Sequence, residues 1–222
     1  MITTIDPLLI SASNRLNESS EDYTPQRIDF CNTAIAEVLG QYAWNCRRKS
    51  FTLVTTPGVQ TYDFTSSSVL PNDDYDPEFG FYEIWNGEQR LDPILYDNMD
   101  NFSESDCFAI SPDNTSLVFT LSQTSSNTYT VWYYARHKDV GAKTTVLNLS
   151  IPDNLKKPIV TYIKYLVHDA KRQRNDARNA LLDFEEQIGD VKLAQGKAKA
   201  KGLKQNIPTP IAYSKFKRKY AF

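Results

Sequence analysis

The sequence predicts an α+β protein: a helix bundle with an inserted antiparallel β-sandwich or small barrel and an extended C-terminal tail. Apolar residues recur every three or four positions on both sides of a middle region, which is the helical period. In the middle region they alternate with polar residues, which is the period of strands. We therefore expect an α-helical lobe of residues 1–50 and 150–190, an inserted β domain of 51–149, and a tail of 191–222.

The composition is that of a folded globular protein. The chain has 222 residues, of which 41% are hydrophobic and 23% charged. It contains no run of the roughly 18 apolar residues that a membrane span needs, and its first residues lack the features of a signal peptide. The three cysteines, Cys31, Cys46 and Cys107, are widely spaced and have no nearby histidines, so we expect neither a disulfide framework nor a zinc site.

Charge is distributed unevenly along the chain. Residues 191–222 contain nine Lys or Arg and no Asp or Glu, although the whole chain has a formal net charge of -2. An acidic body with a basic end is typical of a protein with an interaction segment. Any anionic surface attracts such a segment, the protein's own body included.

Two helices are expected before residue 50. Asp6 is suited to cap the first helix, with Pro7 at its first position. Thr24 and Pro25 form a good start for the second, since proline lacks the N–H that the first helical position leaves unpaired. We expect the second helix to extend to about Arg48, with Cys31 and Cys46 as small core residues. Its apolar stripe is Ile28, Cys31, Ile35, Val38, Leu39, Tyr42 and Cys46.

Seven or eight short strands are expected between residues 51 and 149. KSFTLVTTPGVQTYDF predicts two strands joined by a Pro57-Gly58 turn, and FGFYEIWNGEQRLDPI predicts two more joined at Asn86-Gly87, a strong hairpin signal. FAISPDNTSLVF and YTVWYYARH extend the series. We expect these strands to form the sandwich or small barrel. The expected core or sheet-face aromatic residues are Trp85, Trp132, Phe119 and Tyr134.

A long helix is expected after Pro152. Its apolar stripe begins at Leu155 and continues to Ile188, which predicts a helix of more than about 50 Å if it is unbroken. The polar segment QRND, residues 173–176, could allow a bend. We expect this helix to pack on the first two.

Beyond Asp190 the chain has too few apolar residues to pack on itself, so we expect it to be disordered or extended when alone. Its last residues nevertheless combine cations with aromatic rings, which indicates burial against a partner. The expected docking residues are Lys204, Tyr213, Lys215, Phe216, Lys217, Arg218, Lys219, Tyr220 and Phe222.

No motif favours catalysis, so we expect a protein that is not an enzyme and holds no metal or cofactor. His168 and Asp169 are adjacent on a helix, so their side chains diverge by about 100° and form no relay. The acidic run of residues 72–78 has carboxylates for Ca²⁺ but lacks the ligand spacing and glycine of an EF-hand loop. A solvated, mobile loop is the preferred interpretation of that run.

Several short motifs occur in an order that resembles the head-to-tail adaptor (connector) proteins of tailed bacteriophages, including the tail tubular proteins of short-tailed phages. The resemblance covers about residues 24–190. Its motifs are a Trp near the end of the N-terminal helix, an F-x-x-x-T-x-P-G-x-x-x-Y turn, a tyrosine-bearing strand, a Leu-x-x-Pro element and Asn-Asp on a long helix. The matching residues are Trp44, Phe51, Thr55, Pro57, Gly58, Tyr62, Leu149, Pro152, Asn175 and Asp176.

The resemblance implies a structural virion protein that forms a ring, dodecameric in such adaptors, between the portal protein and a tail or nozzle protein. The genome DNA would pass through its lumen without sequence-specific binding. Residues 191–222 would reach onto the portal. The protein would be made in the host cytoplasm and lie in the neck of the virion, without contact with a membrane.

Two other functions compete with the adaptor interpretation. A nucleic-acid-binding protein would grip phosphates with the basic tail and stack bases on its aromatic rings, with strong salt dependence. A glycan-binding β-sandwich would use the aromatic strands but leave the tail and the long helix unexplained.

Overall fold

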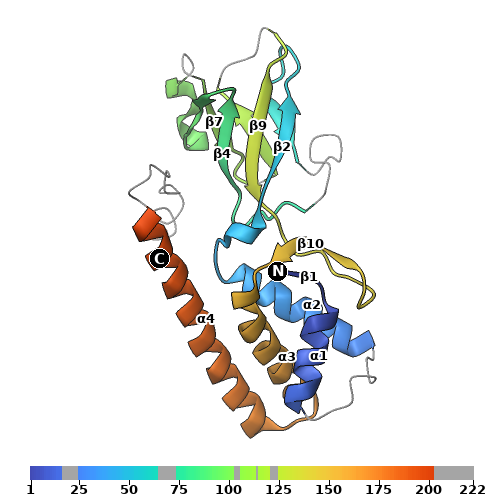
Figure 1. Cartoon of the computed structure of the whole chain (residues 1–222). Coiled ribbons are helices and arrows are strands. Elements are labelled where there is room, and N and C mark those ends of the chain that lie inside the picture. The colour runs from blue at the N-terminus through green and yellow to red at the C-terminus, as the bar shows by residue number, and fades with distance from the viewer. Residues whose placement is uncertain (17–24, 65–73, 103–105, 114, 121–124, 203–222) are drawn as a thin grey trace. The chain divides into compact units, whose positions relative to one another are not determined.

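The computed structural model describes residues 1–16, 25–64, 74–102, 106–113, 115–120 and 125–202, with backbone only for 198–202. The described residues form two compact units (Figure 1). Among the described residues, the helical unit comprises those of 1–47 and 136–202, and the β unit comprises those of 48–135. The predicted α+β class is confirmed.

The helical unit begins with strand β1 (Ile2–Thr4), helix α1 (Asp6–Leu16) and helix α2 (Pro25–Gly40). The start of α1 at Asp6 and of α2 at Pro25 agrees with the sequence signals, although Thr24 lies outside the described residues. The inner faces of α1 and α2 carry small and aliphatic side chains at helical spacing, and burial of these side chains stabilises the unit. They are Leu8, Leu9, Ala12, Cys31, Ala34, Ile35, Val38 and Leu39.

Helix α2 ends at Gly40, so the expectation that it extends to Arg48 was wrong. Two buried side chains from the following segment donate hydrogen bonds to carbonyl groups in the last turn of the helix. The indole Nε1 of Trp44 donates to the carbonyl of Val38 at 2.7 Å, and Nη1 of Arg47 donates to that of Leu39 at 2.7 Å. These hydrogen bonds satisfy acceptors that a helix end leaves unpaired. Cys46 is consequently half-buried in the 3-10 turn η1 (Asn45–Arg47) and is not a residue of α2.

The C-terminal part of the helical unit contains strand β10 (Val146–Ile151), the short 3-10 helix η3 (Asp153–Leu155) and helices α3 (Lys156–Ala170) and α4 (Arg174–Gly202). Strand β10 pairs with β1 in an antiparallel two-stranded sheet. Helix α3 packs on α1, α2 and α4, and therefore forms the centre of the unit (Figure 1).

The expected long helix is broken between α3 and α4. Arg172 has a positive φ of 59°, a conformation that ends a helix. The backbone N–H of Gln173 donates to the carbonyl of His168 at 2.9 Å, and His168 Nδ1 lies 2.6 Å from Gln173 Oε1. Asp176 then lies in the first turn of α4, where a negative charge stabilises the helix. The chain therefore reverses at residues 171–173.

Helix α4 continues through residues 191–202, so the expectation of a disordered or extended chain there was wrong. This stretch has no continuous apolar stripe, but it is rich in lysine and alanine, which favour helix. No helix in the described parts of the chain is long and apolar enough to span a lipid bilayer.

The β unit contains two four-stranded sheets that share a core. One has the strand order β2-β9-β4-β5, and the other β3-β8-β7-β6. All pairs are antiparallel except β6 with β7. Side chains pack between the sheets, as Phe119 does against Tyr129 at 4.8 Å between ring centres. The strand bounds are β2 Arg48–Val54, β3 Thr61–Asp63, β4 Phe81–Asn86, β5 Gln89–Arg90, β6 Asp92–Pro93, β7 Cys107–Ile110, β8 Ser116–Phe119 and β9 Thr128–Tyr134.

The expected turn at Pro57-Gly58 lies between β2 and β3, and this segment carries the chain from one sheet to the other. The backbone N–H of Val59 donates to the carbonyl of Thr56, and Gly58 has φ 82°, as a type II turn requires after proline. The hydroxyl of Tyr62 accepts a hydrogen bond from the N–H of Thr56 at 2.8 Å. The Thr-x-Pro-Gly-x-x-x-Tyr motif therefore builds this crossover.

The hairpin between β4 and β5 is confirmed, with Asn86 opposite Gln89. Its loop residue Gly87 has φ 59°, which glycine adopts without strain. The four aromatic residues expected in the core or on a sheet face divide equally. Phe119 and Tyr134 are buried, whereas Trp85 and Trp132 are half-buried.

Candidate docking surfaces

Helix α4 is fixed to the helical unit along its first part. Ala177, Ala180, Phe184 and Ile188 follow the helical period and are all buried. Phe184 meets the ring of Tyr162 on α3 edge to face, with ring centres 4.8 Å apart. The direction of α4 is therefore set by a continuous apolar contact with α3.

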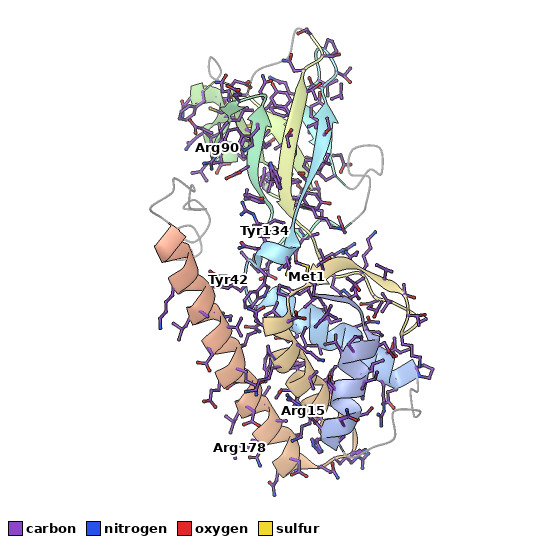
Figure 2. All side chains as sticks on the ribbon, in the orientation of Figure 1. Met1, Arg15, Tyr42, Arg90, Tyr134 and Arg178 are labelled. Carbon is purple, nitrogen blue, oxygen red and sulfur yellow. The ribbon has the colours of Figure 1, made fainter. Side chains whose placement is uncertain are left out.

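Polar contacts reinforce this packing. The hydroxyl of Thr161 on α3 donates to Oε1 of Gln187 on α4 at 2.9 Å, and accepts from Nη1 of Arg15 on α1 at 3.2 Å. Figure 2 labels Arg15 on α1. Further along α4, Nζ of Lys192 donates to Oε1 of Gln41 at 3.2 Å. One buried threonine thus links three helices.

The remainder of α4, residues 192–202, is a basic helical segment that we call the α4 end. It contains Lys192, Lys197, Lys199 and Lys201 and no acidic residue. The side chain of Leu193 is 63% exposed. The docking residues predicted from the sequence, Lys204 to Phe222, come directly after this segment and lie outside the described residues. The site prediction for them therefore stays a prediction.

A second exposed surface lies in the β unit on the 3-10 helix η2 (Tyr96–Phe102), between β6 and β7. None of the seven residues of η2 is buried. The exposed fractions of Leu95, Tyr96 and Phe102 are 45%, 43% and 41%. Asp97 and Asp100 are also exposed. We call these five residues the η2 surface.

Sequence reasoning missed the η2 surface. The segment LDPILYDNMDNF breaks the alternation of a strand without supplying a helical stripe, and only its first four residues were expected in a strand. Its only signal was a group of large apolar residues among aspartates and asparagines. Such residues usually lie in a core, and the folded chain alone reveals that these are exposed.

The half-buried Trp132 and the buried Tyr82 lie near each other on sheet β2-β9-β4-β5. Val131 and Tyr133 of β9 face the core, so Trp132 between them lies on the opposite face. The guanidinium of Arg48 on β2 lies 4.3 Å from the ring centre of Tyr82 on β4, and its Nε donates to the Tyr82 hydroxyl at 2.7 Å. Burial raises the pKa of Tyr82 to about 12, although the Arg48 charge acts in the opposite direction.

The acidic run of residues 72–78 is partly structural, so the preferred interpretation as a solvated, mobile loop was wrong for Asp74. Its side chain is only 1% exposed. Asp74 Oδ2 lies 2.5 Å from Nζ of Lys49, and Oδ1 accepts from the hydroxyl of Tyr133 at 2.7 Å. A buried carboxylate needs such partners, since desolvation of an unpaired charge is costly. Asp74 therefore ties this segment to β2 and β9.

The two histidines have structural surroundings. His137 Nε2 lies 3.3 Å from Oδ1 of Asn32, and the Asn32 amide also pairs with both backbone groups of Val140. Burial lowers the pKa of His137, with Asp139 acting in the opposite direction. His168 pairs with Gln173 at the turn before α4. Neither histidine is arranged with a nucleophile in the hydrogen bonds described for it.

The described residues bring together no group of three or more His, Cys, Asp or Glu side chains suited to a metal ion. Burial raises the pKa of Cys31 to about 12 and that of Cys46 to about 11, so both thiols remain protonated and unreactive at neutral pH. The described surface instead offers three regions that suit contacts with macromolecules: the basic end of α4, the η2 surface with its exposed apolar and acidic side chains, and a sheet face with the half-buried ring of Trp132.

Comparison with known proteins agrees with this structural character. No curated protein matches the chain. A model of the SU10 adaptor protein family matches residues 3–205, which is nearly the whole chain and confirms the resemblance to phage head-to-tail adaptors. The chain therefore belongs to the SU10 adaptor protein family, and is a phage structural adaptor protein.

Proposed function

We propose that the protein forms a ring in the neck of the virion, which connects the portal vertex of the capsid to the tail and lets the genome pass through. Residues 203–222 dock on the portal protein, and another surface meets a tail or nozzle protein. The family match supports the adaptor role.

The observation that carries this proposal is the course of α4. The helix is anchored by buried residues up to Ile188 and by the Lys192–Gln41 hydrogen bond, and then continues to Gly202 without further burial of the described side chains. A helix that continues beyond its last buried residue is suited to hold the segment attached to its end away from the packed core. In this chain that segment is cationic and aromatic, and it closes with YSKFKRKYAF.

A docking tail of this composition is consistent with weak individual contacts. Aromatic side chains supply buried area, and the surrounding cations supply steering and register. Several tails that engage one portal ring simultaneously gain avidity, because each later contact is intramolecular. The acidic remainder of the chain suits a DNA passage, since carboxylates that line the lumen repel the genome and prevent adhesion.

The test is a pull-down from nuclease-treated lysate of phage-infected cells, with retained proteins identified by mass spectrometry. Three chains are compared: the full chain, one that ends at Gly202 and one that ends at Asp190. We expect the portal protein with the full chain only. Portal protein retained by the chain that ends at Gly202 would assign docking to the helix and contradict the role of the tail.

A matched pair of variants separates portal docking from nucleic-acid binding. Replacement of Tyr213, Phe216, Tyr220 and Phe222 by Ala keeps every charged side chain of the tail. Replacement of the tail lysines by Gln keeps every aromatic side chain. We expect the variant without these four aromatic side chains to retain no portal protein in the pull-down. If the full chain retains no virion protein but retains DNA when nuclease is omitted, in a strongly salt-dependent way, the protein is instead a nucleic-acid binder.

A further inference from the structure

The η2 surface has apolar side chains that the described fold does not use. Leu95, Tyr96 and Phe102 lie within eight residues of each other, and each is more than 40% exposed. The hydrogen bond from the N–H of Asn98 to the carbonyl of Leu95 fixes the first turn of this segment. Single exposed apolar residues are ordinary, but a group on one short element is typical of an interaction site.

The α4 end has an exposed leucine between two glycines. Gly189 and Gly196 lie four residues before and three residues after Leu193, hence on the same side of the helix. A Cβ added to either glycine would meet nothing within 4 Å. Glycine weakens a helix relative to alanine, and the described chain gives no packing reason for it at either position. Close approach of another chain supplies such a reason.

The two surfaces are complementary in charge. The η2 surface has two aspartates, and residues 95–102 include no Lys or Arg. The α4 end has four lysines and no acidic residue. Leu193 and Lys197 are four residues apart, so this lysine lies on the same side of the helix as the exposed leucine. Each surface is an apolar centre beside charges of one sign, and the signs are opposite.

We propose that the η2 surface of one copy of this chain docks on the α4 end of the next copy. The proposal rests on the ring of the proposed function, and names the surfaces that join its subunits. In such a contact the two subunits use different surfaces. Each pair therefore still has one free η2 surface and one free α4 end, so the same contact can repeat until the ring closes. Lysines of the α4 end pair with Asp97 and Asp100, and the apolar side chains exclude water between them.

Disulfide cross-linking in assembled particles tests this contact. The full-length variant with Leu95→Cys and Leu193→Cys is incorporated into phage particles, oxidised mildly and separated on a non-reducing gel. Both positions are exposed, so the substitutions leave the core intact. We expect a ladder of multimers of this chain. Each single variant is the control for the native Cys31, Cys46 and Cys107, and should give no ladder.

The outcomes separate the contact from the ring. If microscopy shows a ring of this chain but the double variant gives no ladder, or only a faster-migrating monomer, the contact is refuted and the ring stands. If Leu95→Cys instead cross-links to another virion protein, the η2 surface belongs to that partner and the contact is likewise refuted. If the wild-type chain forms no ring in particles, the proposed function itself fails.

Charge reversal supplies a second test. One variant carries Asp97→Lys and Asp100→Lys, and the other Lys197→Glu and Lys201→Glu. Each alone should need a roughly tenfold higher concentration to assemble, because like charges face each other. A mixture of the two variants should assemble as the wild type does. When the variants alternate around the ring, the reversed η2 surface faces the reversed α4 end and the two unchanged surfaces face each other, so the charges are opposite in every contact. The control variant carries Arg174→Glu and Arg178→Glu at the opposite end of α4 and should leave assembly unchanged. If the mixture of the two charge-reversed variants does not assemble at the wild-type concentration, the proposal is overturned.

Discussion

The helical unit and the β unit are stabilised by different kinds of core. In the helical unit, mostly aliphatic side chains such as Ile159, Ile163 and Val167 are buried at helical spacing. In the β unit, aromatic rings pack on each other within and between the two sheets, and Asp74 is buried against Lys49. The first kind of core appears in the sequence as a period. The second depends on pairs of residues that are far apart in the chain.

The largest expected effect breaks the helical unit. Phe184→Ala should destabilise the protein by about 3–5 kcal/mol, because it leaves a cavity between α3 and α4 where the ring meets Tyr162. Leu182→Ala, on the same helix but 55% exposed, should change stability by less than about 0.5 kcal/mol. Denaturant unfolding measures both. Hydrogen exchange should show the loss of protection first in 1–47 and 136–202, and an equal loss across 48–135 would contradict the distinction between the units.

The next effect breaks the β unit. Asp74→Ala should cost about 2–3 kcal/mol, since it removes the carboxylate that accepts from the Tyr133 hydroxyl and the Lys49 ammonium. The cost stays below that of a fully buried pair, because Lys49 is 26% exposed and can turn to water. Asp100→Ala is the exposed control. Increased hydrogen exchange should be concentrated in 48–135, and a stability equal to that of the control would show that the ion pair is dispensable.

A pH effect sharpens the comparison, because His137 lies in the helical unit. The pKa of His137 is lowered by burial, so the folded chain favours neutral imidazole. As the pH falls from 7.5 to 5.5, unfolded chains bind a proton near the ordinary pKa of 6.5 while folded chains resist it. Stability should therefore fall with decreasing pH, by at most about 1.4 kcal/mol per pH unit. In His137→Gln the slope of this dependence should be smaller; an unchanged slope would assign it to other groups.

The smallest effect is a gain. Gly196→Ala should stabilise the helical unit by about 0.5–1 kcal/mol, because alanine favours helix and its Cβ finds open space. The same substitution should weaken ring assembly if a neighbouring chain approaches this glycine closely. Thermal unfolding of the unassembled chain and assembly at fixed concentration are measured on the same sample. Stabilisation without any loss of assembly would remove the glycine argument for the α4 end.

The sequence predicted the helices of the helical unit better than their ends. The apolar periods of α1, α2, α3 and α4 are local features, and burial agrees with them. The end of α2 depends instead on Trp44 and Arg47, whose side chains return to the carbonyls of Val38 and Leu39. The extension of α4 was not predicted, because residues 191–202 lack an apolar stripe, although lysine and alanine favour helix without packing.

In the β unit the strands and the turns at Pro57-Gly58 and Asn86-Gly87 were predicted, whereas the sheet to which each strand belongs was not. Pro57-Gly58 forms a type II turn, whereas tight hairpins use types I′ and II′, so the turn residues themselves distinguish the crossover from a hairpin. The roles of Asp74 and of the η2 surface could not be predicted from the sequence. One acidic residue among several is buried only because Lys49 and Tyr133 arrive from other strands.

The anchoring of α4 has a geometric consequence for the tail. Because the packed part fixes the axis of the helix and no break separates it from residues 193–202, the ten residues beyond Lys192 extend as a rod of about 15 Å. In a ring of identical subunits, symmetry would place the tips of these rods at one radius and one height, with equal angular spacing. The docking tails would then start from evenly spaced points on a circle. The angular spacing of the tails would therefore be set by the folded helices, and the tails themselves would not have to match the spacing of the portal subunits.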